Sequence, residues 1–157
     1  ARRTLALSHP HEAQADARPF QTPIAKFCCF HVLPPAGLHG RIFKEVLKIA
    51  DKLVVPLQPS VFDIFATRAF LDELAEHRKA SKLQVGIVGS RVDSRTIASD
   101  KLHEFVDSLG LPVLGYLRHT QNYIHLAAQG LTLFDVAPGR VEKDLAQWQG
   151  ICRWLDN

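Results

Sequence analysis

Short apolar runs alternate with longer amphipathic stretches through most of this 157-residue sequence. The apolar runs occupy residues 27–33, 53–57, 83–89 and 112–117, and each is followed by a stretch whose apolar residues recur at helical spacing. Strands that alternate with helices are typical of a parallel β-sheet with helices packed on its faces. The sequence therefore predicts an α/β fold with a mostly parallel sheet.

Helices are expected after each of these runs and at the C-terminal end of the chain. The predicted ranges are 38–50, 61–79, 97–109, 122–129 and 140–156. The apolar side of the second is expected to contain Ile64, Phe65, Ala69, Leu71 and Leu74, and that of the last Leu145, Trp148, Ile151, Trp154 and Leu155. Ser60 is a candidate N-cap for the second helix, and Thr96 or Ser99 for the third. Gly110 is placed to end the third helix, and residues 131–134 are expected to be extended.

Size and composition are those of one ordinary globular domain. The chain has 46% hydrophobic and 22% charged residues, which fits a single domain over residues 1–157. Residues 1–22 combine charge and proline with little periodicity, so we expect an irregular segment there and an α/β core over residues 27–157. The first residue is Ala and no Met occurs, which suits a fragment or a processed chain.

The cysteines, the apolar runs and the net charge limit the possible classes of protein. Cys28, Cys29 and Cys152 form an odd set without paired spacing, which argues against a disulfide framework and a zinc knuckle. A reducing, cytoplasmic location fits best. No apolar run approaches the roughly 18 residues of a membrane-spanning helix. The net charge of +3 permits weak attraction to phosphates without indicating nucleic acid.

Any ligand site is expected in the loops that follow the strands. In parallel α/β sheets, ligands bind beyond the carboxyl ends of the strands. Those ends correspond here to residues 34–37, 58–60, 90–95 and 118–121, all of which we expect to be loops.

Four motifs in these loops resemble one family, in the family's order and at its spacing. They read LPPAGLHG, ADKLVVPLQPSVFDIFATRAFLDEL, VGIVGSRVDSRT and LGLPVLGYLRHTQNYIHLAAQGLTLFD. Together they resemble the ParA/MinD partition ATPases, a branch of the P-loop NTPases with a deviant Walker A loop. The resemblance covers about residues 27–155, the later part of such a protein.

The resemblance implies an ATP- and magnesium-dependent function. Members of the family dimerise with ATP, bind DNA without sequence preference and partition plasmids or chromosomes, and a ParB-like partner protein stimulates hydrolysis. The residues expected to contact nucleotide or to act in switching are Pro35, Gly37, Pro59, Asp63, Ser90, Arg91 and Arg118. The basic positions that are candidates for DNA contact are Arg91, Arg95, Lys101, Arg118, Arg140 and Lys143.

Three departures from the family's pattern limit what this chain is expected to do alone. The family's glycine-rich Walker A loop, which holds phosphates through backbone N–H groups, is missing, and residues 1–26 contain no glycine. Leu33 stands where the family has the acidic residue that organises magnesium and water, and Ser90 stands where it has Asn. We therefore expect no independent ATP hydrolysis, no catalytic or metal-binding residues, and no tight binding of ATP or magnesium by this chain.

Two alternatives remain beside a partition ATPase. One is a non-catalytic interaction module that has kept the sheet and lost the phosphate site. The other is an unrelated flavodoxin-like α/β protein, although residues 34–37 offer few free N–H groups for a phosphate. The missing first strand and helix of the family would leave an apolar sheet edge, so we expect a homo-oligomer, most simply a dimer.

Overall fold

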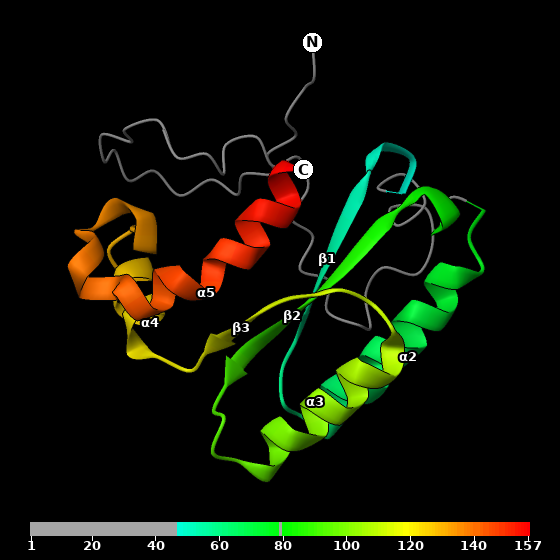
Figure 1. The fold of residues 1–157 in the computed structure, drawn as a ribbon, viewed down its shortest axis with the longest axis horizontal. Coiled ribbons are helices and arrows are strands. Elements are labelled where there is room, and N and C mark those ends of the chain that lie inside the picture. Colours follow the sequence, from blue (N-terminus) through cyan, green and yellow to red (C-terminus); the bar gives the residue numbers. More distant parts are fainter. Residues whose placement is uncertain (1–46, 79) are drawn as a thin grey trace.

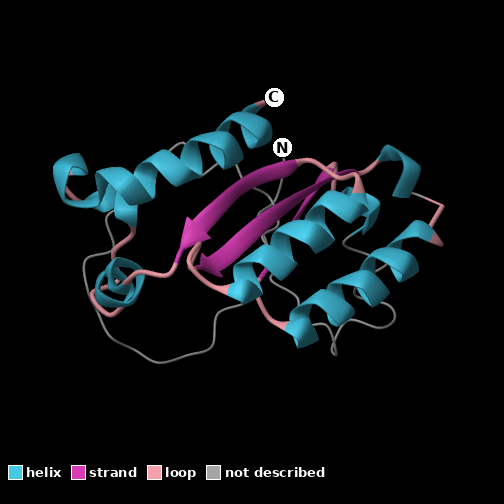
Figure 2. Cartoon of the chain, turned by 60° about the horizontal axis from the view of Figure 1, so that its bottom comes forward, coloured by secondary structure: helices cyan, strands magenta, loops and turns pink. Residues whose placement is uncertain are grey.

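The computed structural model describes residues 47–78 and 80–157, which form a three-stranded parallel sheet with helices on both faces (Figures 1 and 2). The predicted α/β class is confirmed. The elements are β1 (Lys52–Leu57), α2 (Val61–Ala75), η2 (Ala80–Lys82), β2 (Gln84–Val92), α3 (Ile97–Leu109), β3 (Val113–Arg118), α4 (Gln121–Ala127), η3 (Leu133–Asp135) and α5 (Pro138–Asp156). Residues 47–49 are helical and belong to the predicted helix 38–50, whereas Ala50 is not helical. Residues 38–46 of that prediction, the predicted strand 27–33 and the segment 1–22 lie outside the described residues.

The strands lie in the order β1-β2-β3, and both neighbouring pairs are parallel. Helices α2 and α3 cover one face of the sheet, and α5 packs on the other face, mainly against β3 (Figure 2). Side chains of β1 alternate accordingly: Val55 and Leu57 join the core under α2 and α3, whereas Val54 packs towards α5. Burial on both faces explains why the strands read as nearly continuous apolar runs.

The backbones of α5 and β3 approach each other closely at two glycines. A Cβ atom on Gly150 would collide with the backbone carbonyl oxygen of Leu114. A Cβ atom on Gly115 would lie 2.9 Å from the carbonyl oxygen of Gln147. The absence of side chains at these two positions therefore sets the distance between helix and sheet.

Lys52, at the start of β1, caps the C-terminal end of α5. Its Nζ atom donates hydrogen bonds to the carbonyl oxygens of Trp154 (2.7 Å) and Leu155 (3.1 Å) and lies 5.3 Å from the centre of a Trp154 ring. A lysine at a helix C-terminus satisfies carbonyl groups that have no partner within the helix and complements the helix dipole. This contact ties the C-terminal end of the chain to the first described strand.

Several helix ends follow the sequence signals. Thr96 is the N-cap of α3, and its hydroxyl accepts a hydrogen bond from the backbone N–H of Ser99 (3.2 Å). Gly110 ends α3 in the left-handed conformation with φ 62°, as expected for a glycine at this position. The predicted inward positions of Trp148, Ile151, Trp154 and Leu155 on α5 are confirmed by their packing against the sheet.

Other expectations about the helices are correct only in part. Ser60 is the N-cap residue of α2 as predicted, but its side chain makes no capping hydrogen bond, and α2 ends at Ala75 rather than at residue 79. Phe65 and Ala69, predicted to face inward, are exposed, because α2 carries apolar residues around most of its circumference. Residues 131–134 are not extended throughout: Thr132 and Asp135 form a capping box that begins the 3₁₀ turn η3.

Candidate functional site

The loops that follow β1, β2 and β3 lie at one edge of the sheet because the strands are parallel. The last residues of β2 and β3, Val92 and Arg118, pair with each other, and the last residue of β1, Leu57, pairs with Gly89 shortly before the end of β2. Figure 1 shows α4 and the beginning of α5 beyond the end of β3. We call this region the carboxyl edge; its described members come from residues 58–63, 90–96 and 118–122.

The β1 side of the carboxyl edge is a tight turn into α2. The backbone N–H of Ser60 donates to the carbonyl oxygen of Gln58 at 2.8 Å, which places Pro59 inside the turn. Asp63 lies in the first turn of α2, where a carboxylate is favourable with the helix dipole. The structure thus places two of the expected site residues, Pro59 and Asp63, at the predicted edge.

Ser90, Arg91 and Val92 belong to β2, so only residues 93–95 of the predicted loop 90–95 lie outside the strand. Arg118, predicted to begin the loop 118–121, is likewise the last residue of β3. The register with β3 shifts between Gly89 and Val92, so Ser90 and Arg91 form an irregularity in the strand. Arg91 has φ 54°, a left-handed conformation that side-chain-bearing residues rarely adopt. Such backbone strain costs roughly 1–3 kcal/mol and tends to occur at functional sites.

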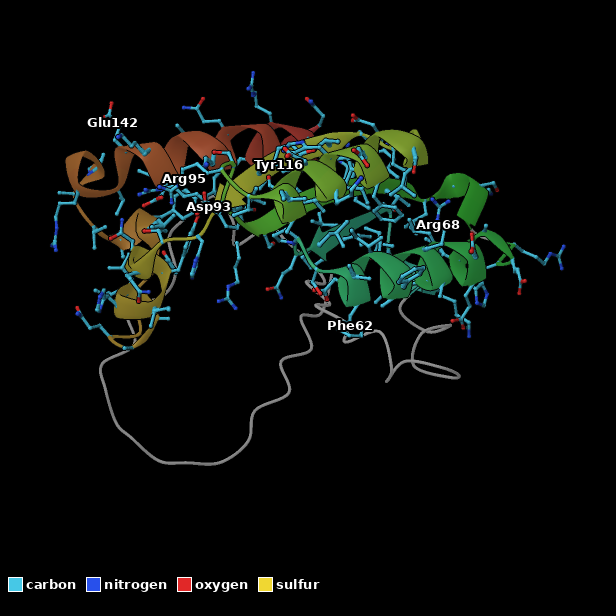
Figure 3. The ribbon with its side chains drawn as sticks, turned by 90° about the horizontal axis from the view of Figure 1, so that it is seen from below. Phe62, Arg68, Asp93, Arg95, Tyr116 and Glu142 are labelled. Carbon is cyan, nitrogen blue, oxygen red and sulfur yellow. The ribbon has the colours of Figure 1, made fainter. Side chains whose placement is uncertain are left out.

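Asp93 and Arg95 form a bidentate ion pair just after β2. The Nε and Nη2 atoms of Arg95 lie 2.9 and 2.8 Å from the two carboxylate oxygens of Asp93 (Figure 3). This hydrogen bonding lowers the pKa of Asp93 to about 2, with a smaller contribution from nearby His119. The backbone N–H of His119 also donates to the carbonyl oxygen of Val92 (3.2 Å), so β2 and β3 remain joined at this point.

A second ion pair joins the end of β3 to α5. Arg118 Nε donates to Oδ1 of Asp144 at 2.5 Å, and Asn122 Nδ2 donates to Oδ2 of Asp144 at 2.7 Å. The side chain of Asp144 is fully buried, whereas that of Arg118 is 42% exposed. The hydrogen bond from Arg118 holds the pKa of Asp144 below its ordinary value against the opposing effect of burial, so the carboxylate is charged at neutral pH.

Further hydrogen bonds fix α4 and α5 around this pair. Gln147 Oε1 accepts from the backbone N–H of Arg118 at 2.9 Å, and the hydroxyl of Tyr123 accepts from Trp148 Nε1 at 3.0 Å. Burial raises the pKa of the Tyr123 phenol, and the hydrogen bond from Trp148 opposes that shift. The side chain of Arg118 therefore projects from a backbone that is held on both sides.

The sequence analysis missed Asp144, Asn122 and Gln147. A signal for Asp144 existed, because it shares a helical face with Val141, Trp148 and Ile151, and a carboxylate on an apolar face needs a partner. The structure brings together Ser90, Arg91 and Arg118 at the ends of β2 and β3, with Pro59 and Asp63 on the β1 side of the same edge. The predicted residues Pro35 and Gly37, like Leu33, lie outside the described residues.

The basic residues predicted to contact DNA differ in their surroundings. Arg95 pairs with Asp93, Lys101 with Glu104, and Arg118 with Asp144. The other three candidates, Arg91, Arg140 and Lys143, make no ion pair with any residue that the structure describes. Half of the predicted positive charge is thus neutralised by a neighbouring carboxylate.

Within residues 47–78 and 80–157, no group of three or more His, Cys, Asp and Glu side chains is arranged to hold a metal ion. Among the same residues, no helix has the length and apolar character needed to cross a bilayer.

Comparison with known proteins finds no family model that matches the chain. Over 113 residues, the chain is 25% identical to maintenance of carboxysome distribution protein A from Halothiobacillus neapolitanus. The matched part covers 70% of this chain and 52% of that protein, so the chain spans about half the length of the relative. This similarity supports the ParA/MinD-like resemblance at the level of the family.

Proposed function

We propose that this chain provides the later part of a ParA-type ATPase that positions a cargo through ATP-dependent dimerisation. In the version that the resemblance implies, the cargo is plasmid or chromosomal DNA, and the dimer binds DNA without sequence preference. The name of the relative extends the possible cargo to a protein assembly, since that protein maintains carboxysome distribution. The setting of such a function is the cytoplasm.

The observation that carries this proposal is the arrangement of the carboxyl edge. Residues from three separate motifs, represented by Pro59, Arg91 and Arg118, meet at the edge where parallel α/β sheets bind their ligands. The described residues fit the base side of a nucleotide better than its phosphates. Arg118 offers N–H donors there, whereas the sequence contains no glycine-rich loop that could hold phosphates.

ATP would supply the energy of the switch, and this chain would supply the residues around its base. We propose that Arg91 and Arg118 contact the nucleotide and that Pro59 and Asp63 transmit its presence to α2; the positive φ of Arg91, the exposed guanidinium of Arg118 and the position of Asp63 in the first turn of α2 support this. Phosphoryl transfer depends on neutralising and positioning phosphates. The absence of a Walker A loop from these 157 residues and the presence of Leu33 lead us to propose that the chain does not hydrolyse ATP by itself.

The same proposal implies three partners: a second copy of the chain, DNA and a ParB-like protein. The dimer is supported by the exposed apolar side chains of Val61, Phe62 and Phe65 at the N-terminal end of α2, beside Pro59 and Asp63. DNA contact would rely most on Arg91, Arg140 and Lys143, which form no ion pair with a described residue, and would weaken as salt concentration rises. A ParB-like protein is the expected stimulating partner.

Nucleotide binding by the 157-residue chain tests the proposal directly. The chain is titrated with magnesium ATP in the millimolar range and followed by NMR. The intact mass of the natural protein is measured separately, to determine whether it is longer than these 157 residues. We expect weak binding whose chemical-shift changes include Arg91 and Arg118. Tight, magnesium-dependent binding would show that a phosphate site exists after all, and complete absence of binding would favour the non-catalytic interaction module.

A further inference from the structure

Asp144 is a charged side chain in a place where packing alone does not require one. It is fully buried on α5, and its two carboxylate oxygens accept hydrogen bonds from Arg118 and Asn122, which precede it by 26 and 22 residues. Burial of a charge costs free energy that a single ion pair often does not recover, and an apolar side chain can pack as well. A buried carboxylate with two such partners is therefore better explained by the orientation that it imposes on them.

Asp144 orients the exposed end of the Arg118 side chain. An arginine has five N–H donors, one on Nε and four on the terminal nitrogens. Asp144 occupies Nε, Gln147 accepts from the backbone N–H, and no described residue accepts a hydrogen bond from the terminal nitrogens. These nitrogens therefore remain available at the carboxyl edge on a side chain whose position is already fixed. A fixed side chain loses less conformational entropy when it binds a ligand.

The net charge of the Arg118–Asp144 pair indicates which part of a ligand Arg118 contacts. Because Asp144 is ionised and lies against the guanidinium, the two side chains together carry no net charge. A neutral pair attracts a triphosphate weakly but still donates hydrogen bonds and presents a planar surface. Ring nitrogens and carbonyl oxygens of a base accept such hydrogen bonds, and the guanidinium plane can stack on a base.

We propose that Asp144 is a positioning residue that holds the Arg118 guanidinium at the carboxyl end of β3, so that its terminal nitrogens contact the base of a nucleotide rather than the phosphates. This proposal rests on the proposed function, because it assumes that a nucleotide binds at the carboxyl edge. Asn122 completes the arrangement: its hydrogen bond to Asp144 places the start of α4 beside the same carboxylate.

The test compares two ligands that differ in the base. Magnesium ATP and magnesium tripolyphosphate are titrated into the 157-residue chain, and the ratio of their dissociation constants is measured by NMR. The variants are Asp144→Asn, which keeps the shape and removes the charge, Arg118→Gln, and the double variant. Asp135→Asn is the control, since it removes another hydrogen-bonded carboxylate, one that accepts from Thr132 and not from Arg118 or Asn122.

For the unmodified chain we expect tighter binding of ATP than of tripolyphosphate. Asp144→Asn and Arg118→Gln should each lower the preference for ATP over tripolyphosphate about tenfold, as expected for a lost hydrogen-bonded contact to the base. The ratio of the two dissociation constants is the readout because the change in net charge at the pair acts on the triphosphate of both ligands alike. The double variant should lose little more than either single variant, because both act through one contact. Asp135→Asn should bind both ligands as the unmodified chain does.

The outcomes separate the two proposals. If the unmodified chain binds neither ligand, nucleotide binding at this edge is refuted, and the positioning role with it. If it prefers ATP but Asp144→Asn behaves identically, only the positioning role is refuted. An equal loss of ATP and tripolyphosphate affinity would indicate a structural or phosphate-directed role. Should Asp144→Asn fail to fold, Arg118→Lys decides, because it keeps the charge at an exposed position but not the planar fork, and it should lose the preference for ATP.

Discussion

Arg91 carries local backbone strain at the point where β2 leaves regular pairing. Its φ of 54° places an exposed arginine in a conformation that costs an L-residue roughly 1–2 kcal/mol. The residue lies in the strand irregularity between Gly89 and Val92, next to the end of β3. A side chain kept there at such a cost is consistent with the ligand contact that we propose for it.

Replacement of Arg91 by glycine should therefore stabilise the fold. Glycine adopts positive φ without strain but loses more entropy on folding, about 0.5–1 kcal/mol, so the expected net gain is up to about 1 kcal/mol. Urea denaturation measures the free energy of unfolding. Arg91→Ala is the control, because it removes the same side chain and keeps the strain. Equal stability of the Gly and Ala variants would contradict the prediction.

Sequence reasoning located part of the candidate site because the end of an apolar run indicates where a strand ends and its following loop begins. Pro59 lies two residues after the apolar run 53–57, Arg118 comes directly after the run 112–117, and the parallel sheet brings such positions together. Asp144 was missed because its partners lie 22 and 26 residues earlier, and spacing along a helix does not reveal a contact across the fold. Irregularity at Arg91 was missed because it results from the register between two strands.

At the scale of elements, α5 and β3 depend on each other through their glycines. Gly150 faces the carbonyl oxygen of Leu114, so the helix lies closer to the strand than side chains would permit. Helical periodicity predicted α5, and strand-like runs predicted β1 to β3, since both patterns are local. Periodicity does not encode the separation of two packed backbones, which is why this contact emerged only from the structure.

Gly150→Ala should destabilise the protein even though alanine favours helices. Its Cβ would meet a backbone atom that cannot rotate away, and overpacking costs typically about 1–3 kcal/mol. The gain in helix propensity of about 1 kcal/mol offsets part of this, so we expect a net loss of up to about 2 kcal/mol and a melting temperature lower by a few degrees.

Gly139, in the first turn of the same helix, is the matched control, because a Cβ atom there meets nothing within 4 Å. Gly139→Ala should leave stability unchanged or raise it by up to about 1 kcal/mol. Calorimetry on both variants decides the question. Similar melting temperatures for the two would mean that α5 can shift away from β3 without cost.

At the scale of the whole molecule, α2 presents large apolar side chains to solvent. Phe62 is 86% and Phe65 is 70% exposed, and Figure 3 shows Phe62 on the side of α2 that faces away from the sheet. Large exposed aromatic side chains that adjoin one another often mark a surface for protein association. Their position next to Pro59 and Asp63 would couple association to a ligand at the carboxyl edge.

We expect Phe62→Ser with Phe65→Ser to weaken self-association without unfolding the chain. Because both side chains are mostly exposed, the free energy of unfolding should change by no more than about 0.5 kcal/mol. Light scattering across a range of protein concentrations, with and without magnesium ATP, should show a higher average mass for the unmodified chain than for the double variant. Ile97→Ser removes an apolar side chain that is 78% exposed on α3, and should leave the mass unchanged. A monomeric unmodified chain under every condition would refute the predicted dimer, whereas a dimer that survives the double substitution would place its interface elsewhere.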